Sequence, residues 1–179
     1  MKASAIIALA LSALATPALA DPFDGFRAFC LETSGEFAVA MAAANEAGWS
    51  ADPRIADPDR KVLINPETVD NPLPELFMAG EAALDDGRSY PSCAVAGPAD
   101  WNHLIARMNA WAKFEADKAN PEEPIWIFTL GPEGPTNQAQ LADIDPAELA
   151  VAAETLGPIY LVGLRTANVG PFLFFTRIL

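Results

Sequence analysis

Cys30, Cys93 and His103 are the side chains of this 179-residue chain with the most direct chemistry: nucleophilic attack, thiol exchange, metal ligation and proton transfer. The cysteines lack the Cys-x-x-Cys spacing of a redox pair, and one histidine leaves a four-ligand zinc site incomplete. Serine or cysteine catalysis would have to use His103, and no Gly-x-Ser-x-Gly or His-Glu-x-x-His motif occurs. We therefore expect no metal, no cofactor and no catalytic residue of these classes.

His103 lies on a predicted helix that begins after Asp100, a residue suited to the N-cap. Trp101, Leu104 and Met108 follow the spacing of the apolar side of a helix. His103 comes two positions after Trp101, about 200° around the helix from it. We expect an exposed histidine without a catalytic role.

The 24 acidic residues keep one catalytic alternative open, a hydrolase that uses paired carboxylates. Such a mechanism needs two carboxylates about 5–10 Å apart in a cleft. Glu36 and Glu46 lie too far apart on one predicted helix, and Glu122 and Glu123 lie in a loop bounded by prolines. No catalytic pair is assigned, and a non-catalytic protein is the favoured interpretation.

Residues 1–20 have the organisation of a secretory signal peptide. Lys2 supplies the positive start, an apolar run extends from Ala5 to Ala15, and Ala18-Leu19-Ala20 has the pattern that signal peptidase reads. This run is shorter than the roughly 20 residues of a membrane helix, and no later stretch is apolar for long enough. We predict a mature protein of residues 21–179, periplasmic or secreted, without a membrane span.

Export would place Cys30 and Cys93 in an oxidising compartment, where an even number of cysteines is typical of disulfides. A bond between them would close a loop of about 64 residues, which the chain-entropy model values at about 4 kcal/mol. Cys30 is not expected to carry a lipid, because the bulky and charged residues Phe26 to Phe29 precede it, well beyond the predicted cleavage site. We predict a structural disulfide.

Charge restricts the possible partners. The predicted mature chain has ten basic and 24 acidic side chains, a net charge of −14, and no Lys/Arg cluster. This field repels nucleic acids and anionic lipid surfaces. A basic envelope protein is the partner class that the charge favours, although acidity alone is also typical of a soluble protein without such a partner.

The remaining patterns predict a chain of mixed helices and strands. Two short helices are expected before Trp49, the second opened by a capping box of Thr33 and Glu36 and closed at Gly48. Asp86-Gly87 predicts the turn of a β-hairpin, and the segment 131–138 reads as a Gly/Pro loop. The segment 50–72 reads as a long loop with at most a short strand at 61–64. The other expected elements are strands near 75–84, 88–96, 125–130, 158–166 and 170–179, and helices near 100–117 and 145–157.

This order of elements favours a single α+β domain over residues 21–179. Its expected architecture is a largely antiparallel sheet of about five strands, with three or four helices packed on one face. No internal repeat and no low-complexity segment is recognisable.

The segment 26–49 is similar to the start of a group of small exported proteobacterial proteins of uncharacterised function. The similarity lies in a Phe-x-x-x-Cys-x-x-Thr pattern, an alanine-rich helix and a final Gly-Trp, with a later Ser-Cys-x-Val. Here the matching positions are Phe26, Cys30, Thr33, Gly48 and Trp49, followed by Ser92, Cys93 and Val95. The resemblance implies the disulfide and the exported location, and it brings no catalytic residues.

Together these features predict an exported, disulfide-stapled acidic protein that binds another molecule as an envelope accessory protein. An inhibitor of a basic hydrolase is one concrete form of this role. The alternative is a periplasmic hydrolase that uses paired carboxylates.

Overall fold

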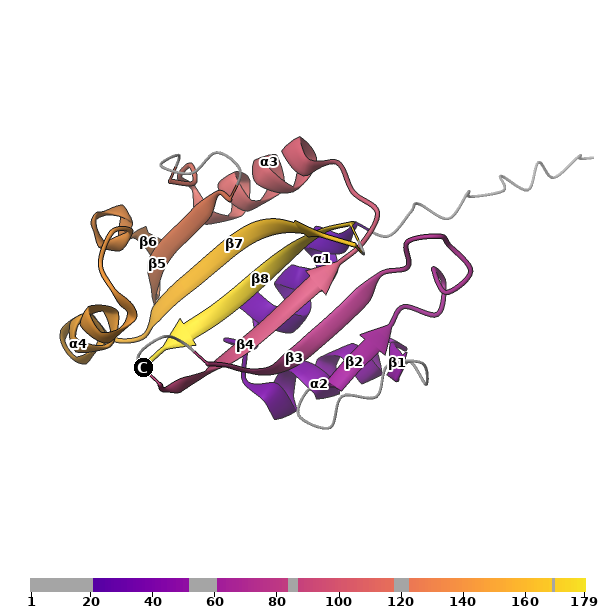
Figure 1. Cartoon of the computed structure of the whole chain (residues 1–179), viewed down its shortest axis with the longest axis horizontal. Helices are drawn as coiled ribbons and strands as arrows, with labels where there is room; N and C mark the ends of the chain where they lie inside the picture. The colour runs from indigo at the N-terminus through magenta and orange to yellow at the C-terminus, as the bar shows by residue number, and fades with distance from the viewer. Residues whose placement is uncertain (1–20, 52–60, 84–86, 118–122, 169) are drawn as a thin grey trace, which may run out of the picture.

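The computed structural model describes residues 21–51, 61–83, 87–117, 123–168 and 170–179. The predicted signal peptide and Asp86 of the predicted Asp86-Gly87 turn lie outside these ranges. The described part is an α+β structure built on one antiparallel sheet (Figure 1). No helix of the described part is long and apolar enough to span a membrane.

The sheet has eight strands in the order β1-β2-β3-β4-β8-β7-β5-β6, and all neighbours are antiparallel. Their bounds are β1 Ser50–Ala51, β2 Lys61–Ile64, β3 Leu76–Ala83, β4 Ser89–Ala96, β5 Ile125–Gly131, β6 Gly134–Asn137, β7 Ile159–Ala167 and β8 Gly170–Ile178. The predicted hairpin is confirmed as β3–β4, and the two predicted C-terminal strands are confirmed as β7–β8.

The expectation of about five strands is wrong, because the structure adds the short strands at both edges of the sheet. The edge strand β6 lies in the segment predicted to be a Gly/Pro loop. Gly134 takes a φ of +106°, which lets the chain reverse directly after β5. Pro135 is tolerated beside Leu130 because β6 is at the sheet edge.

Five helical segments accompany the sheet: α1 Pro22–Phe26, a π-helical turn at Arg27–Leu31, α2 Phe37–Glu46, α3 Trp101–Ala112 and α4 Pro146–Leu156. A 3₁₀ turn at Ala139–Leu141 precedes α4. Asp100 and Asp145 cap α3 and α4, as their positions predict. Their side chains accept hydrogen bonds from the backbone amides of His103 and Glu148.

The predicted capping box of Thr33 and Glu36 is wrong. The Thr33 hydroxyl donates backwards to the Phe29 carbonyl, and Glu36 occupies the N-cap of α2 without a side-chain hydrogen bond to the helix. The Glu36 carboxylate instead accepts from Arg177 of β8, at 3.2 Å. The box is absent because α2 begins at Phe37, three residues later than predicted, which puts Glu36 at the N-cap and not at N3.

Side chains alternate between the two faces of the sheet. On one face, which we call the helix-covered face, α1, α2 and α3 pack on buried residues of β3, β4, β5, β7 and β8. In Figure 1, α1 and α2 lie behind the strands. Completely buried members of this core include Trp126, Phe77, Phe128 and Phe175.

The opposite face, which we call the open face, has a helix only at one end among the residues that the structure describes. There α4 buries Leu149, Ala150 and Ala153 against Ile159 and Ile178, as its position beside the ends of β7 and β8 shows (Figure 1). The expectation that all helices lie on one face is therefore wrong. An apolar side of a helix predicts that it packs on the sheet, but does not predict on which face.

Candidate functional site

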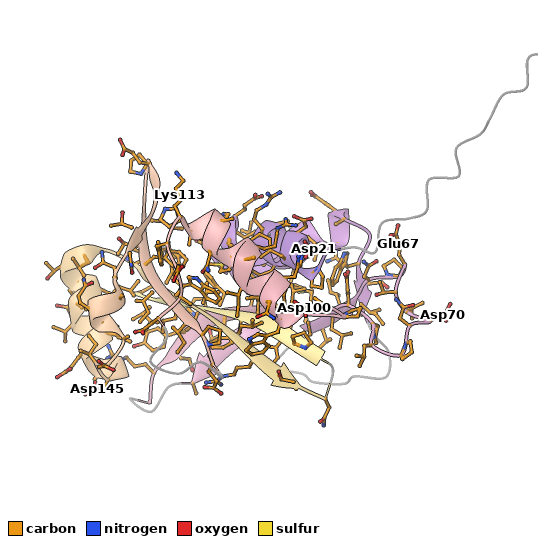
Figure 2. All side chains as sticks on the ribbon, turned by 90° about the horizontal axis from the view of Figure 1, so that it is seen from above. Asp21, Glu67, Asp70, Asp100, Lys113 and Asp145 are labelled. Carbon is orange, nitrogen blue, oxygen red and sulfur yellow. A yellow bond between two sulfur atoms is a disulfide. The ribbon has the colours of Figure 1, made fainter. Side chains whose placement is uncertain are left out.

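The first predicted mature residue, Asp21, lies in a polar cluster between α1 and α3. Its Oδ1 accepts the Phe23 amide at 3.0 Å, which caps α1. Its Oδ2 lies 3.0 Å from Nε2 of His103 and also accepts from Arg107. The same guanidinium donates to Asp24 at 2.7 Å. Figure 2 shows Asp21 near the Asp100 end of α3 and away from Lys113 at the other end.

His103 is therefore half exposed, as predicted, but it has a defined partner. The contact ties α3 to the start of α1, across 82 residues of sequence. Arg107 reinforces it by lying over the Phe23 ring, 4.9 Å from its centroid. These contacts give His103 a role in joining two helices.

Behind this cluster, Glu75 is the most deeply buried carboxylate of the described part, at 2% exposure. Asn65 Nδ2 donates to its Oε2 at 2.8 Å, and the Glu75 amide donates to the Thr68 hydroxyl at 2.9 Å. Burial raises the pKa of the Glu75 carboxyl above its ordinary value. The Asn65 hydrogen bond opposes that rise in pKa, and repulsion from Asp21 and Glu67 adds to it.

Asp21 and Glu75 are two carboxylates close enough for the charge of Asp21 to raise the pKa of Glu75. Both oxygens of Asp21 are occupied by contacts within the protein. A Cβ on Gly97 would lie within 2.9 Å of both Pro22 and the Glu75 side chain, so that the three residues are tightly packed together. The pair therefore lies in packed structure, away from the hollow described below.

The carboxylates considered from the sequence are spread over the surface. Glu36 binds Arg177, and Glu123 binds Arg165 at 3.3 Å. Glu46 is exposed near the end of α2, and Glu122 lies outside the described residues. No group of three or more His, Cys, Asp or Glu side chains within the described ranges is arranged to hold a metal ion.

Cys30 and Cys93 form the predicted disulfide, with their Cα atoms 5.8 Å apart. Both residues are buried in the helix-covered core, at 0% and 2% exposure. The bond joins the π-helical turn to the centre of β4. Its position at the centre of the packing is that of a structural staple.

The open face contains a hollow of about 150 Å³ over β3, β4 and β8. Its floor carries the small residues Gly80, Ser92 and Ala94, whereas Met78, Phe172 and Phe174 supply the larger side chains. The register explains this, because Gly80 lies opposite Ser92 and Met78 opposite Ala94. Sequence reasoning missed this hollow, although small residues within strands are a recognisable signal of unfilled space.

A second feature of the molecule is the acidic segment 131–158, which contains five acidic residues and neither lysine nor arginine. The exposed side of α4 belongs to it and carries Glu148, Val151 and Glu154. Val151 is 64% exposed, more than any other large apolar residue of the described part. Figure 2 places Asp145, the cap of α4, at the opposite end of the molecule from Glu67 and Asp70.

Comparison with known proteins adds no assignment. No family model, no curated protein and no solved structure matches this chain. The functional conclusions therefore depend on the residues and their geometry.

Proposed function

We propose that the mature protein is an exported, non-catalytic binding protein whose partner is a basic envelope protein. A basic hydrolase that it inhibits is the concrete form we favour. The observation that carries the proposal is the exposed side of α4, where Val151 stands between Glu148 and Glu154. An apolar centre surrounded by polar residues is the usual anatomy of a protein interface.

The distribution of charge supports a basic partner. On the rest of the described structure, most arginines are neutralised by a contacting carboxylate: Arg27 by Glu32, Arg107 by Asp21 and Asp24, Arg165 by Glu123, and Arg177 by Glu36. The segment 131–158 contains no lysine or arginine, and none of these four arginines pairs with one of its carboxylates. Its field therefore remains available to steer a cationic protein.

The chemically capable residues also support a binding role. The two cysteines are joined to each other, His103 contacts Asp21, and Glu75 is held by Asn65. Each of these groups takes part in packing or in joining elements. The proposal assigns none of them to turnover.

The test measures inhibition of basic lysozyme-type hydrolases by the oxidised mature protein, residues 21–179, at low salt, where attraction between opposite charges is strongest. We expect inhibition that weakens as salt rises. The variant Glu148→Gln/Glu154→Gln should weaken it several-fold. The matched control Glu46→Gln/Glu67→Gln removes the same charge from exposed positions elsewhere and should have little effect.

Two outcomes would contradict the proposal. Basic hydrolases that stay fully active with micromolar mature protein would exclude the inhibitor form. Equal losses in the two double variants would mean that total charge, and not the α4 surface, governs binding. Screening glycoside and ester substrates tests the hydrolase alternative, which turnover by the purified protein would restore.

A further inference from the structure

We infer that the open face binds a small amphipathic carboxylate, with its apolar tail in the hollow and its carboxylate on Arg165. This site goes beyond the proposed basic partner, because it lies on other elements and takes a ligand of opposite charge. Its success or failure is independent of the α4 surface.

The hollow exists because the Phe174 ring is turned toward β7 and leaves the space over β3 and β4 unfilled. A Cβ on Gly163 of β7 would overlap the Phe174 ring, so the ring of this β8 residue lies over the neighbouring strand β7. On the other side of β8, Ala94 is the direct partner of Phe174 and is too short to fill the space. The hollow is therefore bounded by the Phe174 ring on one side and has small residues at its base.

The size and lining of the hollow define the tail of the ligand. A volume of about 150 Å³ equals that of an enclosed apolar cavity that binds benzene, and this hollow is partly open to solvent. The residues around it are mainly apolar, and the polar ones are Ser92 on the floor and Glu81, an exposed residue of β3. A short aliphatic or aromatic group fits this description.

Arg165 defines the head group. It lies on β7 directly opposite Phe172, and its guanidinium sits 4.9 Å from the centroid of the Phe174 ring. Arg165 is not itself a lining residue of the hollow, but its guanidinium lies against Phe174, which is. A guanidinium binds a carboxylate through two parallel hydrogen bonds, which makes a carboxylate the complementary head.

In the structure, the Glu123 carboxylate pairs with the Arg165 guanidinium. Its two oxygens lie 3.3 and 3.4 Å from Arg165 nitrogens, and the side chains are 43% and 49% exposed. An ion pair with this exposure contributes little stability. The carboxylate of a ligand, held additionally by its buried tail, can therefore replace Glu123 on the guanidinium.

The experiment titrates sodium octanoate into the oxidised protein, residues 21–179, and follows backbone amides by NMR. It is run near physiological salt, which screens the negative charge of the whole chain beyond about 8 Å. Octylammonium and 1-octanol serve as probes with the same tail and a different head. We expect octanoate to shift Gly80, Ala94, Phe174 and Arg165, and to bind about tenfold more tightly than either comparator.

Three variants separate the head-group contact from general effects. Arg165→Gln should weaken octanoate about tenfold, and Glu123→Gln should tighten it, because the internal competitor is lost. The matched control is Arg27→Gln, which removes an equally exposed arginine that pairs with Glu32 at 3.3 Å. It should leave octanoate affinity unchanged.

Equal affinities for octanoate and octylammonium would overturn the inference. So would shifts that map away from the open face, or identical effects of Arg165→Gln and Arg27→Gln. An absence of shifts at millimolar octanoate would also overturn it. Ser92→Leu provides a second measurement, since filling the floor from a partly exposed position should abolish the shifts of Gly80 and Ala94.

Discussion

On the helix-covered face, Trp126, Phe128 and Phe175 are completely buried, whereas Phe172 and Phe174 on the open face remain partly exposed. Neighbouring residues of β8 thus have different environments although they belong to one strand. The difference comes from what lies over each face, since three helices cover one and α4 reaches only the end of the other.

The two faces have different consequences for the protein. Burial of large apolar side chains supplies most of the favourable free energy of folding, so the helix-covered face should determine stability. A partly exposed apolar surface contributes less to stability and is available for contact with another molecule. The comparison predicts that substitutions on the helix-covered face mainly lower stability, whereas those on the open face have smaller effects on stability and change binding.

The largest expected difference is between Trp126→Ala and Phe172→Ala. Trp126 is completely buried, and its Nε1 donates to Asn109 at 2.8 Å. Its loss should lower the free energy of unfolding by about 3–5 kcal/mol, because a cavity remains and the Asn109 oxygen keeps only the Ala116 amide as a donor. Phe172→Ala should cost about 1 kcal/mol, as expected for a side chain that water already reaches. Urea unfolding of both variants measures the contrast, and equal costs would break it.

The next effect concerns the staple of the helix-covered face. Cys30→Ala/Cys93→Ala should destabilise the protein by about 4 kcal/mol, because the unfolded chain loses the constraint of a loop closed across 63 positions. Denaturation of the wild type under reducing conditions should reproduce this loss. A loss below about 1 kcal/mol would mean that packing around Cys30 and Cys93 suffices without the bond.

The smallest expected effect concerns Glu75, the buried carboxylate that accepts a hydrogen bond from Asn65. Folding raises the pKa of Glu75, so the stability that its protonation contributes is complete below its ordinary pKa of 4.5 and is lost as pH rises through the folded value. Glu75→Gln should therefore be more stable than the wild type at neutral pH. This advantage should shrink on acidification and disappear below about pH 4.5.

Thermal unfolding from pH 4 to pH 8 measures this trend. Glu81→Gln is the control, because Glu81 is exposed on β3. An advantage of Glu75→Gln that stays constant with pH would show that the Glu75 carboxyl has no raised pKa in the folded protein.

Local sequence patterns predicted the elements whose signals are contained in a few neighbouring residues. Asp100 and Asp145 begin their helices as expected, and both predicted hairpins form. The Thr33–Glu36 box failed because residues 32–35 form a turn and α2 begins only at Phe37, which puts Glu36 at the N-cap and not at N3. Strand β6 was missed because its Gly- and Pro-rich sequence resembles a loop, and pairing with β5 makes it a strand.

The candidate sites were less predictable, since their parts lie far apart in the sequence. Asp21 meets Arg107 across 86 positions, and Arg165 meets Glu123 across 42. The hollow needs Phe174 beside Gly163 and Ala94, which lie on the two strands flanking β8. Composition alone did indicate the acidic balance of the chain, because charge is counted without knowledge of the fold.

The sequence by itself determined the helices and most strands, the pairing of the two cysteines and the acidic balance of the chain, because turns, caps, periodicity and charge are local or additive properties. Tertiary structure alone decided that β8 lies between β4 and β7, that α4 packs on the opposite face from α1–α3, and that a hollow remains between small and aromatic side chains. These features depend on contacts between segments that are distant in the sequence. Packing of the whole domain selects one arrangement of these segments among several that the local patterns allow.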